Sequence, residues 1–315
     1  MIQYIAKVDG QVTRLEKATP GCWVNISPPF SHEELEELAQ KFEIPIDFLI
    51  DPLDLDERSR YEREEDVRLI IINTPLLNEL EEEIDAIFIT VPVGILLTPD
   101  YILTVTSFEN PILKRFADGN VKNFDPEDDR LFVLQLFEQT VLRYLKCLKQ
   151  LNLKRNLIEQ ELYDSSRNKE LKQLLSIEKS LVYFVNSLSA NELLKMKMKR
   201  IDFLQIRKDE DLTDLFEDII IDNSQALEMS NVYTNILNGT MDAYSSIISN
   251  NLNVVIQRLT LITIILMVPT LVASFYGMNV PVPFRDSTYS FFFIVLTSVV
   301  ISLLLAWYFQ RKRLF

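Results

Sequence analysis

The stretch that decides the fold is residues 253–279, which read NVVIQRLTLITIILMVPTLVASFYGMN. Its central 18 residues, 259–276, carry no charge. A helix of that length is just long enough to cross the hydrocarbon core of a bilayer. A second uncharged run, 289–309, follows after about a dozen residues. We therefore predict two transmembrane helices, 259–276 and 289–310, which are joined by an outer loop, 277–288.

One face of the first span is polar. Positions spaced alternately three and four apart share a helix face. This row, the polar stripe, is Asn253, Ile256, Thr260, Thr263, Met267, Thr270 and Ser274. The neighbouring row is apolar apart from one arginine and consists of Val254, Arg258, Leu261, Ile265, Val268 and Val272. Two interpretations stay open: the hydroxyls serve helix packing and backbone bonding, or several copies enclose a pore with this stripe.

A short motif ends the first span. Tyr276-Gly277-Met278-Asn279 resembles the signature of the CorA-type divalent-cation transporters. The context resembles that family too, because the motif lies between the last two spans. A Leu259-Thr260 pair opens the first span, a Pro269-Thr270 pair lies midway, and residues 242–253 (DAYSSIISNNLN) are similar to the family's stalk.

The resemblance implies a homopentamer that conducts hydrated Mg²⁺ inward, with Co²⁺ and Ni²⁺ as further candidates. Gly277, Met278 and Asn279 would form the outer mouth, where Gly277 lets the backbone turn. Cytosolic Mg²⁺ would close the channel. Asp218 and Asp222 lie four residues apart on one helix face. They are either a plain surface pair or, as the resemblance implies, ligands of regulatory Mg²⁺.

Two departures from the family pattern concern the outer end. Many members have an acidic residue in the outer loop, whereas here Arg285 stands beside Asp286. Ser274 occupies a position where many members have glycine. A zinc-transporting relative is the alternative within the family, and a non-conducting two-span sensor is the alternative outside it.

Charge is divided unevenly along the chain. The first 250 residues hold 27 Lys and Arg against 45 Asp and Glu. This acidic excess argues against nucleic-acid binding, which depends on phosphate neutralisation. It suits either simple solubility or the handling of cations.

No catalytic motif is visible, so we predict no enzyme and no catalytic cofactor. His32 is the one histidine, which disfavours zinc enzymes and Ser-His-Asp hydrolases. The six glycines do not cluster, so the chain has neither a P-loop nor a dinucleotide-binding fingerprint. Cys22 and Cys147 have apolar neighbours and are expected to be buried thiols.

The flanks of the spans predict the orientation. The tail, 311–315, is basic, and the positive-inside rule places it in the cytoplasm. Two spans return the large N-terminal part to the same side. The first residues, MIQYIAKVDG, do not resemble a signal peptide. We therefore expect a protein of the inner (cytoplasmic) membrane, in contact with lipid, with both termini cytoplasmic.

The soluble part divides at residue 125. Residues 1–124 predict an α/β domain with a mixed sheet, from strand-like runs at 2–8, 23–26, 69–73, 84–93 and 101–106. A capping box, Ser31 to Glu34, starts a helix. The charged run 53–68 predicts a solvated loop and strand edge.

Residues 125–208 predict a helical segment. Asp125 is the expected N-cap of the first helix, with Pro126 at its first position. A second helix is expected over 169–188, and a capping box at Ser189 starts a third. The basic cluster Lys195, Lys197, Lys199 and Arg200 is expected on a solvated face. Residues 209–258 predict a stalk helix that continues into the membrane, because no proline intervenes before Pro269.

Overall fold

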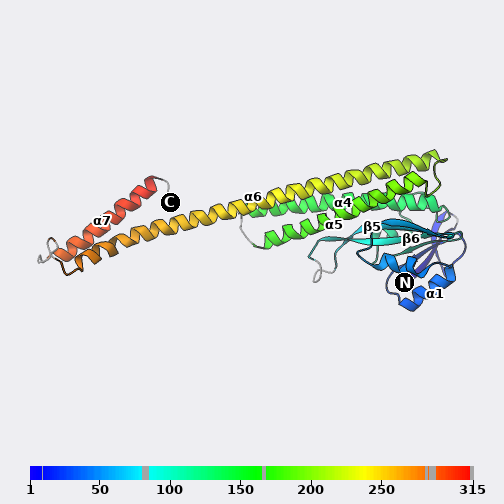
Figure 1. Cartoon of the computed structure of the whole chain (residues 1–315), viewed down its shortest axis with the longest axis horizontal. Coiled ribbons are helices and arrows are strands. Elements are labelled where there is room, and N and C mark those ends of the chain that lie inside the picture. Colours follow the sequence, from blue (N-terminus) through cyan, green and yellow to red (C-terminus); the bar gives the residue numbers. More distant parts are fainter. Residues whose placement is uncertain (9, 80–84, 165–167, 281–282, 284–288, 313–315) are drawn as a thin grey trace. The chain divides into compact units, whose positions relative to one another are not determined.

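The computed structural model describes residues 1–315 except 9, 80–84, 165–167, 281–282, 284–288 and 313–315 (Figure 1). The chain forms two compact units, Met1–Met241 and Asp242–Phe315. The strands are β1 (Ile2–Val8), β2 (Gln11–Leu15), β3 (Trp23–Ile26), β4 (Arg60–Glu64), β5 (Val67–Leu77), β6 (Phe88–Leu97) and β7 (Ile102–Val105). The helices are α1 (His32–Phe42), α2 (Ile46–Ile50), α3 (Pro111–Ala117), α4 (Asp129–Asp164), α5 (Asn168–Ile201), α6 (Glu210–Tyr276) and α7 (Ser290–Arg311), with a 3₁₀ turn at Asp51–Leu53.

The first unit contains a mixed sheet with strand order β2-β1-β3-β7-β6-β5-β4. The pair β3 and β7 is parallel, and the other described pairs are antiparallel. Edge strand β2 was not predicted, whereas edge strand β4 lies within the charged run 53–68, where a solvated loop and strand edge were expected. Both are short and polar, QVTRL in β2 and RYERE in β4. Charged side chains are typical of edge strands, and they hide the strand signal in the sequence.

Helices cover both faces of this sheet. Val24 and Ile26 of β3 point to one face and join a core with Leu35 and Leu38 of α1. Trp23 points to the other face, where its ring lies 5.4 Å from the ring of Phe132 in α4. Figure 1 shows α4, α5 and the beginning of α6 on that second face, and α1 on the first. The alternation of side chains along each strand produces both cores.

The helix starts confirm one prediction and correct another. Ser31 caps α1 with a reciprocal capping box to Glu34. In contrast, α4 begins at Asp129, and Asp128 accepts hydrogen bonds from the backbone N–H of Arg130 and Leu131, each at 3.2 Å. Asp125 instead accepts from Glu127 at 3.1 Å within a preceding turn. The predicted cap at Asp125 was therefore wrong by one turn.

The predicted break at Ser189 is also absent, because α5 runs unbroken from Asn168 to Ile201. A capping box needs its first residue in extended backbone. Here α5 remains in contact with the sheet past Ser189, because Asn191 donates to the Asn73 carbonyl of β5, and Leu194 and Met198 are buried. This burial favours a continuous helix. The basic cluster needs correction too: Lys197, Lys199 and Arg200 are exposed, but Lys195 is fully buried.

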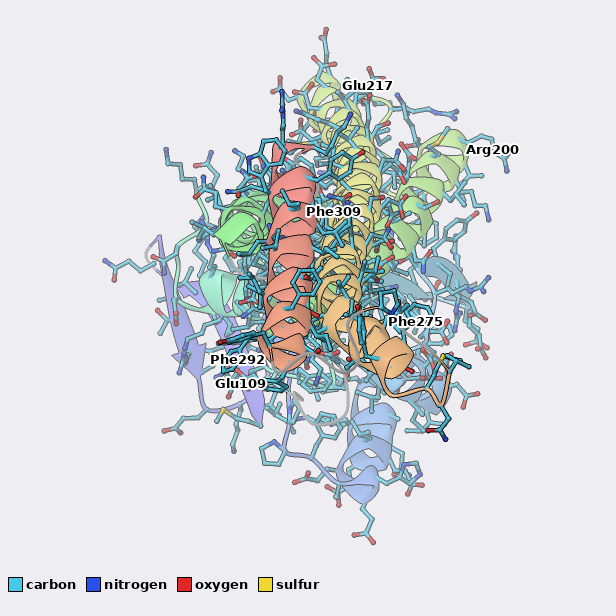
Figure 2. All side chains as sticks on the ribbon, turned by 90° about the vertical axis from the view of Figure 1, so that its left-hand side faces the viewer. Glu109, Arg200, Glu217, Phe275, Phe292 and Phe309 are labelled. Carbon is cyan, nitrogen blue, oxygen red and sulfur yellow. The ribbon has the colours of Figure 1, made fainter. Side chains whose placement is uncertain are left out.

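The second unit is a helical hairpin in which the end of α6 runs beside α7 (Figures 1 and 2). Figure 2 shows Phe292 and Phe309 on α7 and Phe275 near the end of α6. Both helices are long and apolar enough to cross a membrane. Pro269 lies inside α6 and has no N–H to give to the carbonyl of Ile265, four residues earlier. Ser302 of α7 donates to that carbonyl at 3.3 Å, which satisfies it from the partner helix.

Candidate functional site

The two rows of the first span face different surroundings. In the neighbouring row, Leu261 is buried, and Ile265, Val268 and Val272 are half-buried. All seven residues of the polar stripe are exposed: Asn253, Ile256, Thr260, Thr263, Met267, Thr270 and Ser274. Helix α7 therefore covers the neighbouring row from Leu261 to Val272, whereas Val254, Arg258 and the whole polar stripe are exposed.

The hydroxyls of the stripe bond back to their own helix. Thr260 donates to the carbonyl of Ile256 at 2.9 Å, and Thr263 donates to that of Leu259 at 2.8 Å. Thr270 makes a longer bond, 3.4 Å, to the carbonyl of Leu266. This geometry uses each hydroxyl hydrogen and leaves the oxygen lone pairs outward. The stripe thus offers hydrogen-bond acceptors. The backbone bonding that the sequence suggested for these hydroxyls is present as well.

The outer motif follows directly on the end of α6. The Gly277 N–H donates to the carbonyls of Ala273 at 2.9 Å and Ser274 at 3.2 Å, and Gly277, Met278 and Asn279 are exposed. Gly277 does not adopt positive φ, and a Cβ there would meet its nearest atom at an ordinary 3.4 Å. The chain therefore leaves the helix at Gly277 without the left-handed backbone conformation that favours glycine. Arg285 and Asp286, which depart from the family pattern, lie outside the described residues.

The two regulatory candidates lie near the beginning of α6. Asp218 is exposed and Asp222 is half-buried. Within the described part of the chain, no three His, Cys, Asp or Glu side chains gather closely enough to hold a metal ion. A single chain therefore presents these carboxylates without a finished set of ligands.

A buried polar cluster, not predicted from the sequence, connects the sheet to α5. The backbone carbonyl of Asn73 accepts from Asn191 at 2.9 Å and from Tyr144 at 3.0 Å. Ser59 donates to the Asn191 side chain at 2.6 Å. Burial raises the pKa of Tyr144 well above its ordinary value, so it remains a donor at neutral pH. The sequence feature that could have indicated this cluster is Asn73 itself, because it interrupts a run of isoleucines.

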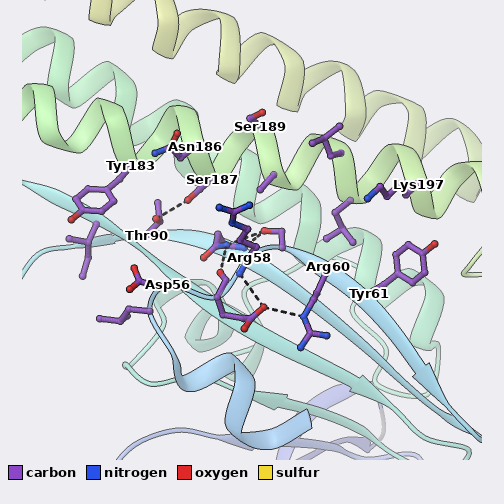
Figure 3. A pocket seen from close by; sticks show the side chains of 18 residues that line it. Asp56, Arg58, Arg60, Tyr61, Thr90, Tyr183, Asn186, Ser187, Ser189 and Lys197 are labelled. Carbon is purple, nitrogen blue, oxygen red and sulfur yellow. Dashed lines mark hydrogen bonds and ion pairs between the residues drawn. The ribbon is translucent and has the colours of Figure 1, made fainter. Parts of the chain in front are cut away.

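A groove of about 1130 Å³ lies between this α5 surface and the loop before β4 (Figure 3). On its lower side, Arg60 pairs with Asp51 at 2.5 Å and with Glu57 at 3.0 Å. Partial burial raises the pKa of Asp51, and the charge of Arg60 opposes that shift. Figure 3 shows Arg58 between the loop and α5, with Tyr183 farther along the helix. The groove is polar and open, and its Arg60 is already paired with Asp51 and Glu57.

Comparison with known proteins identifies the family of this chain. A family model of CorA-like Mg²⁺ transporter proteins matches residues 20–312. The chain belongs to this family. The CorA-like chain is 29% identical over 299 residues to the cobalt/magnesium transport protein CorA of Methanocaldococcus jannaschii, which covers 92% of this chain and 90% of that protein.

Solved structures agree on the fold. The complete CorA magnesium transporter of M. jannaschii superposes with a TM-score of 0.81 at 24% identity, covering 99% of this chain and 98% of that one. The cytoplasmic domain of ZntB from Vibrio parahaemolyticus matches with a TM-score of 0.60 at 11% identity, over 79% of this chain and 98% of that one. The chain thus has the predicted fold, with an N-terminal mixed-sheet domain, long helices and a C-terminal apolar helix. Its membership of the family makes it a membrane transporter.

Proposed function

We propose that this chain transports Mg²⁺ across the membrane by channel-like influx of the hydrated ion. The observation that carries the proposal is the open polar stripe on α6, because α7 covers the neighbouring row from Leu261 to Val272 instead. Exposing polar groups to lipid is costly, which favours a second copy or water opposite the stripe. The name of the M. jannaschii relative supports both Mg²⁺ and Co²⁺ as cargo.

The chemistry of the stripe fits a hydrated cation. Mg²⁺ loses its water shell reluctantly and prefers octahedral oxygen coordination. Those bound waters are hydrogen-bond donors, and the back-bonded hydroxyls of Thr260 and Thr263 present acceptors to them. A ring of Asn279 carbonyl oxygens would hold the hydrated ion at the mouth without binding it too tightly to leave. Met267 would form an apolar constriction, and Met278 would pack, because thioether sulfur is a poor ligand for a hard cation.

The driving force is the membrane potential. A divalent ion that enters a negative interior gains roughly 4.6 kcal/mol per 100 mV, twice the single-charge value. The lack of clustered glycines agrees with transport that does not use a nucleotide.

Assembly and orientation complete the proposal. The chain is a subunit of a homopentamer, five polar stripes enclose the pore, and lipid covers the outer surfaces. Both termini are cytoplasmic in the inner membrane, as the basic tail favours. Cytosolic Mg²⁺ then binds Asp218 or Asp222 together with groups of another copy, because the described residues of a single chain contain no complete ligand set there. Zn²⁺ is the cargo to test against Mg²⁺.

Ion flux into liposomes that contain the purified full-length protein tests this function. We expect Mg²⁺ uptake, weaker or no Zn²⁺ uptake, and a loss of at least about tenfold in Asn279→Ala, since the ring loses all its mouth ligands. Mg²⁺ on the side of the soluble unit should slow uptake, and Asp218→Ala should blunt that response. Wild-type flux in Asn279→Ala would contradict the role of Asn279 in holding the ion at the outer mouth. Faster uptake of Zn²⁺ than of Mg²⁺ would show that Zn²⁺ is the transported ion. Absence of any divalent flux would contradict the transport proposal.

A further inference from the structure

A fully buried lysine connects three helices of the first unit. Lys195 of α5 is 0% exposed, although Lys197, two residues on, is exposed. The Lys195 Nζ donates to the Asn223 side chain of α6 at 2.7 Å and lies 5.5 Å from the ring centroid of Phe137 in α4. Lysine is almost never fully buried unless it is paired with a charge. This position therefore requires an explanation beyond packing.

The surroundings of Lys195 contain little negative charge. From α6 it meets the neutral amide of Asn223, and from α4 it meets the aromatic ring of Phe137. From its own helix, the half-buried Glu192 is the carboxylate whose field acts on it. Among the described residues, Lys195 forms no ion pair. One amide oxygen and one ring face leave part of the ammonium group unsatisfied, whereas a neutral amine has fewer donors to satisfy.

The amide of Asn223 fixes the geometry from the other side. Its Nδ2 donates to the backbone carbonyl of Leu188 in α5 at 3.0 Å, and Asn223 itself is fully buried. The amide thus bridges two turns of α5 and directs its oxygen at Lys195. Any change that repels the lysine head group also disturbs this bridge, which is a direct polar connection between α5 and α6.

We propose that Lys195 is an internal proton-binding site and that its protonation loosens the contact between α5 and α6. Burial lowers the pKa of Lys195 to about 7, against a weaker opposing effect of Glu192. Protonation in the cytoplasmic pH range then places an incompletely paired charge between the helices. Because α6 continues as the first span, the same step makes Mg²⁺ uptake sensitive to pH; this consequence rests on the proposed function.

Hydrogen exchange of the full-length protein in detergent, from pH 6 to pH 9, tests the proton site. The folded pKa lies below the unfolded one, so the opened state binds more protons and the closed state gains stability as pH rises above about 7. We expect protection of the α5 and α6 amides around Lys195 and Asn223, corrected for intrinsic exchange, to rise about tenfold per pH unit in that window.

Two substitutions remove the titration, and one serves as a control. Lys195→Met fills the same space without charge, and Lys195→Gln keeps a donor toward Asn223. Both should abolish the added pH dependence and should be better protected than the wild type at pH 6. Lys197→Met, with its exposed side chain, should keep the wild-type profile. A wild type with no added pH dependence, or Lys195 variants that retain it, would overturn the proposal.

A flux measurement separates this inference from the transport function. Uptake of Mg²⁺ at pH 6.5 and pH 8 on the side of the soluble unit should differ in the wild type and be equal in Lys195→Met. Equal uptake in the wild type, with the exchange result intact, would reject the connection to transport. Absence of flux in every protein would overturn the proposed function and that connection, while the exchange result would still support the proton site.

Discussion

The two units of this chain treat polar groups in opposite ways. In Met1–Met241, buried polar side chains such as Asn73, Asn191 and Asn223 find partners within the chain. In Asp242–Phe315, the hydroxyls of α6 are exposed, and so are large apolar residues such as Leu266 and Phe291. The first unit closes its own core. The second obtains its environment from lipid and, in our proposal, from further copies of the chain.

This difference teaches where substitutions should affect folding and where they should affect function. A buried side chain in the first unit has fixed neighbours, so its removal leaves a cavity or an unpaired group. An exposed side chain of the second unit is enclosed much less by neighbours of the same chain. Its removal should change assembly or conduction more than folding.

The largest stability effect is expected at Trp23. This residue is fully buried, packs on Phe116, Phe124 and Phe132, and donates to Thr104 at 2.9 Å. Trp23→Ala should cost about 3–5 kcal/mol, measured by thermal unfolding of the full-length protein in detergent. The control Phe291→Ala, with its side chain 70% exposed, should cost about 0.5 kcal/mol or less. Equal losses of stability in the two variants would contradict the difference proposed between the units.

An intermediate effect is expected where α7 satisfies the carbonyl freed by Pro269. Ser302→Ala should cost about 0.5–1 kcal/mol, the usual value of a hydrogen bond between membrane helices. In a Pro269→Ala background, residue 269 regains an N–H that bonds to the Ile265 carbonyl, and the same substitution should cost less. Denaturation of the four proteins in mixed micelles measures the coupling. The same cost in both backgrounds would show that the proline and Ser302 are independent.

The smallest stability effect is expected on the polar stripe. Thr263→Val removes one back-bonded hydroxyl from an exposed position and should change stability by about 0.5 kcal/mol or less. Mg²⁺ uptake should nevertheless fall about fivefold, the equivalent of one hydrogen bond of about 1 kcal/mol. Leu266→Val, exposed but off the stripe, is the matched control and should keep its flux. A large loss of stability with unchanged flux would show that the stripe serves helix packing instead.

Local patterns predicted much of the fold. The alternating runs at 2–8 and 23–26 became β1 and β3 with the same bounds, and the capping box at Ser31 starts α1. These features depend on neighbours within a few residues. Edge strand β2, the start of α4 and the continuity of α5 were not predicted, because residues outside each local pattern decide them. Strand β2, for example, is a strand because β1 pairs with it.

The candidate site divides in the same way. Spacing alone identified the polar stripe, and the motif Gly277-Met278-Asn279 gave the family resemblance that the comparisons bear out. Spacing did not indicate which row α7 covers. It also did not indicate that Lys195 is buried while the other basic residues of its cluster are exposed. Both depend on the direction from which a second helix approaches.

By itself, therefore, the sequence determined the two apolar spans, the polar row on the first and the acidic soluble part, since length, periodicity and charge are properties of the chain alone. Only the tertiary structure decided which helix face is open and which polar groups lose water. The physical reason is that burial is set by what packs against a residue, and that neighbour belongs to another part of the chain.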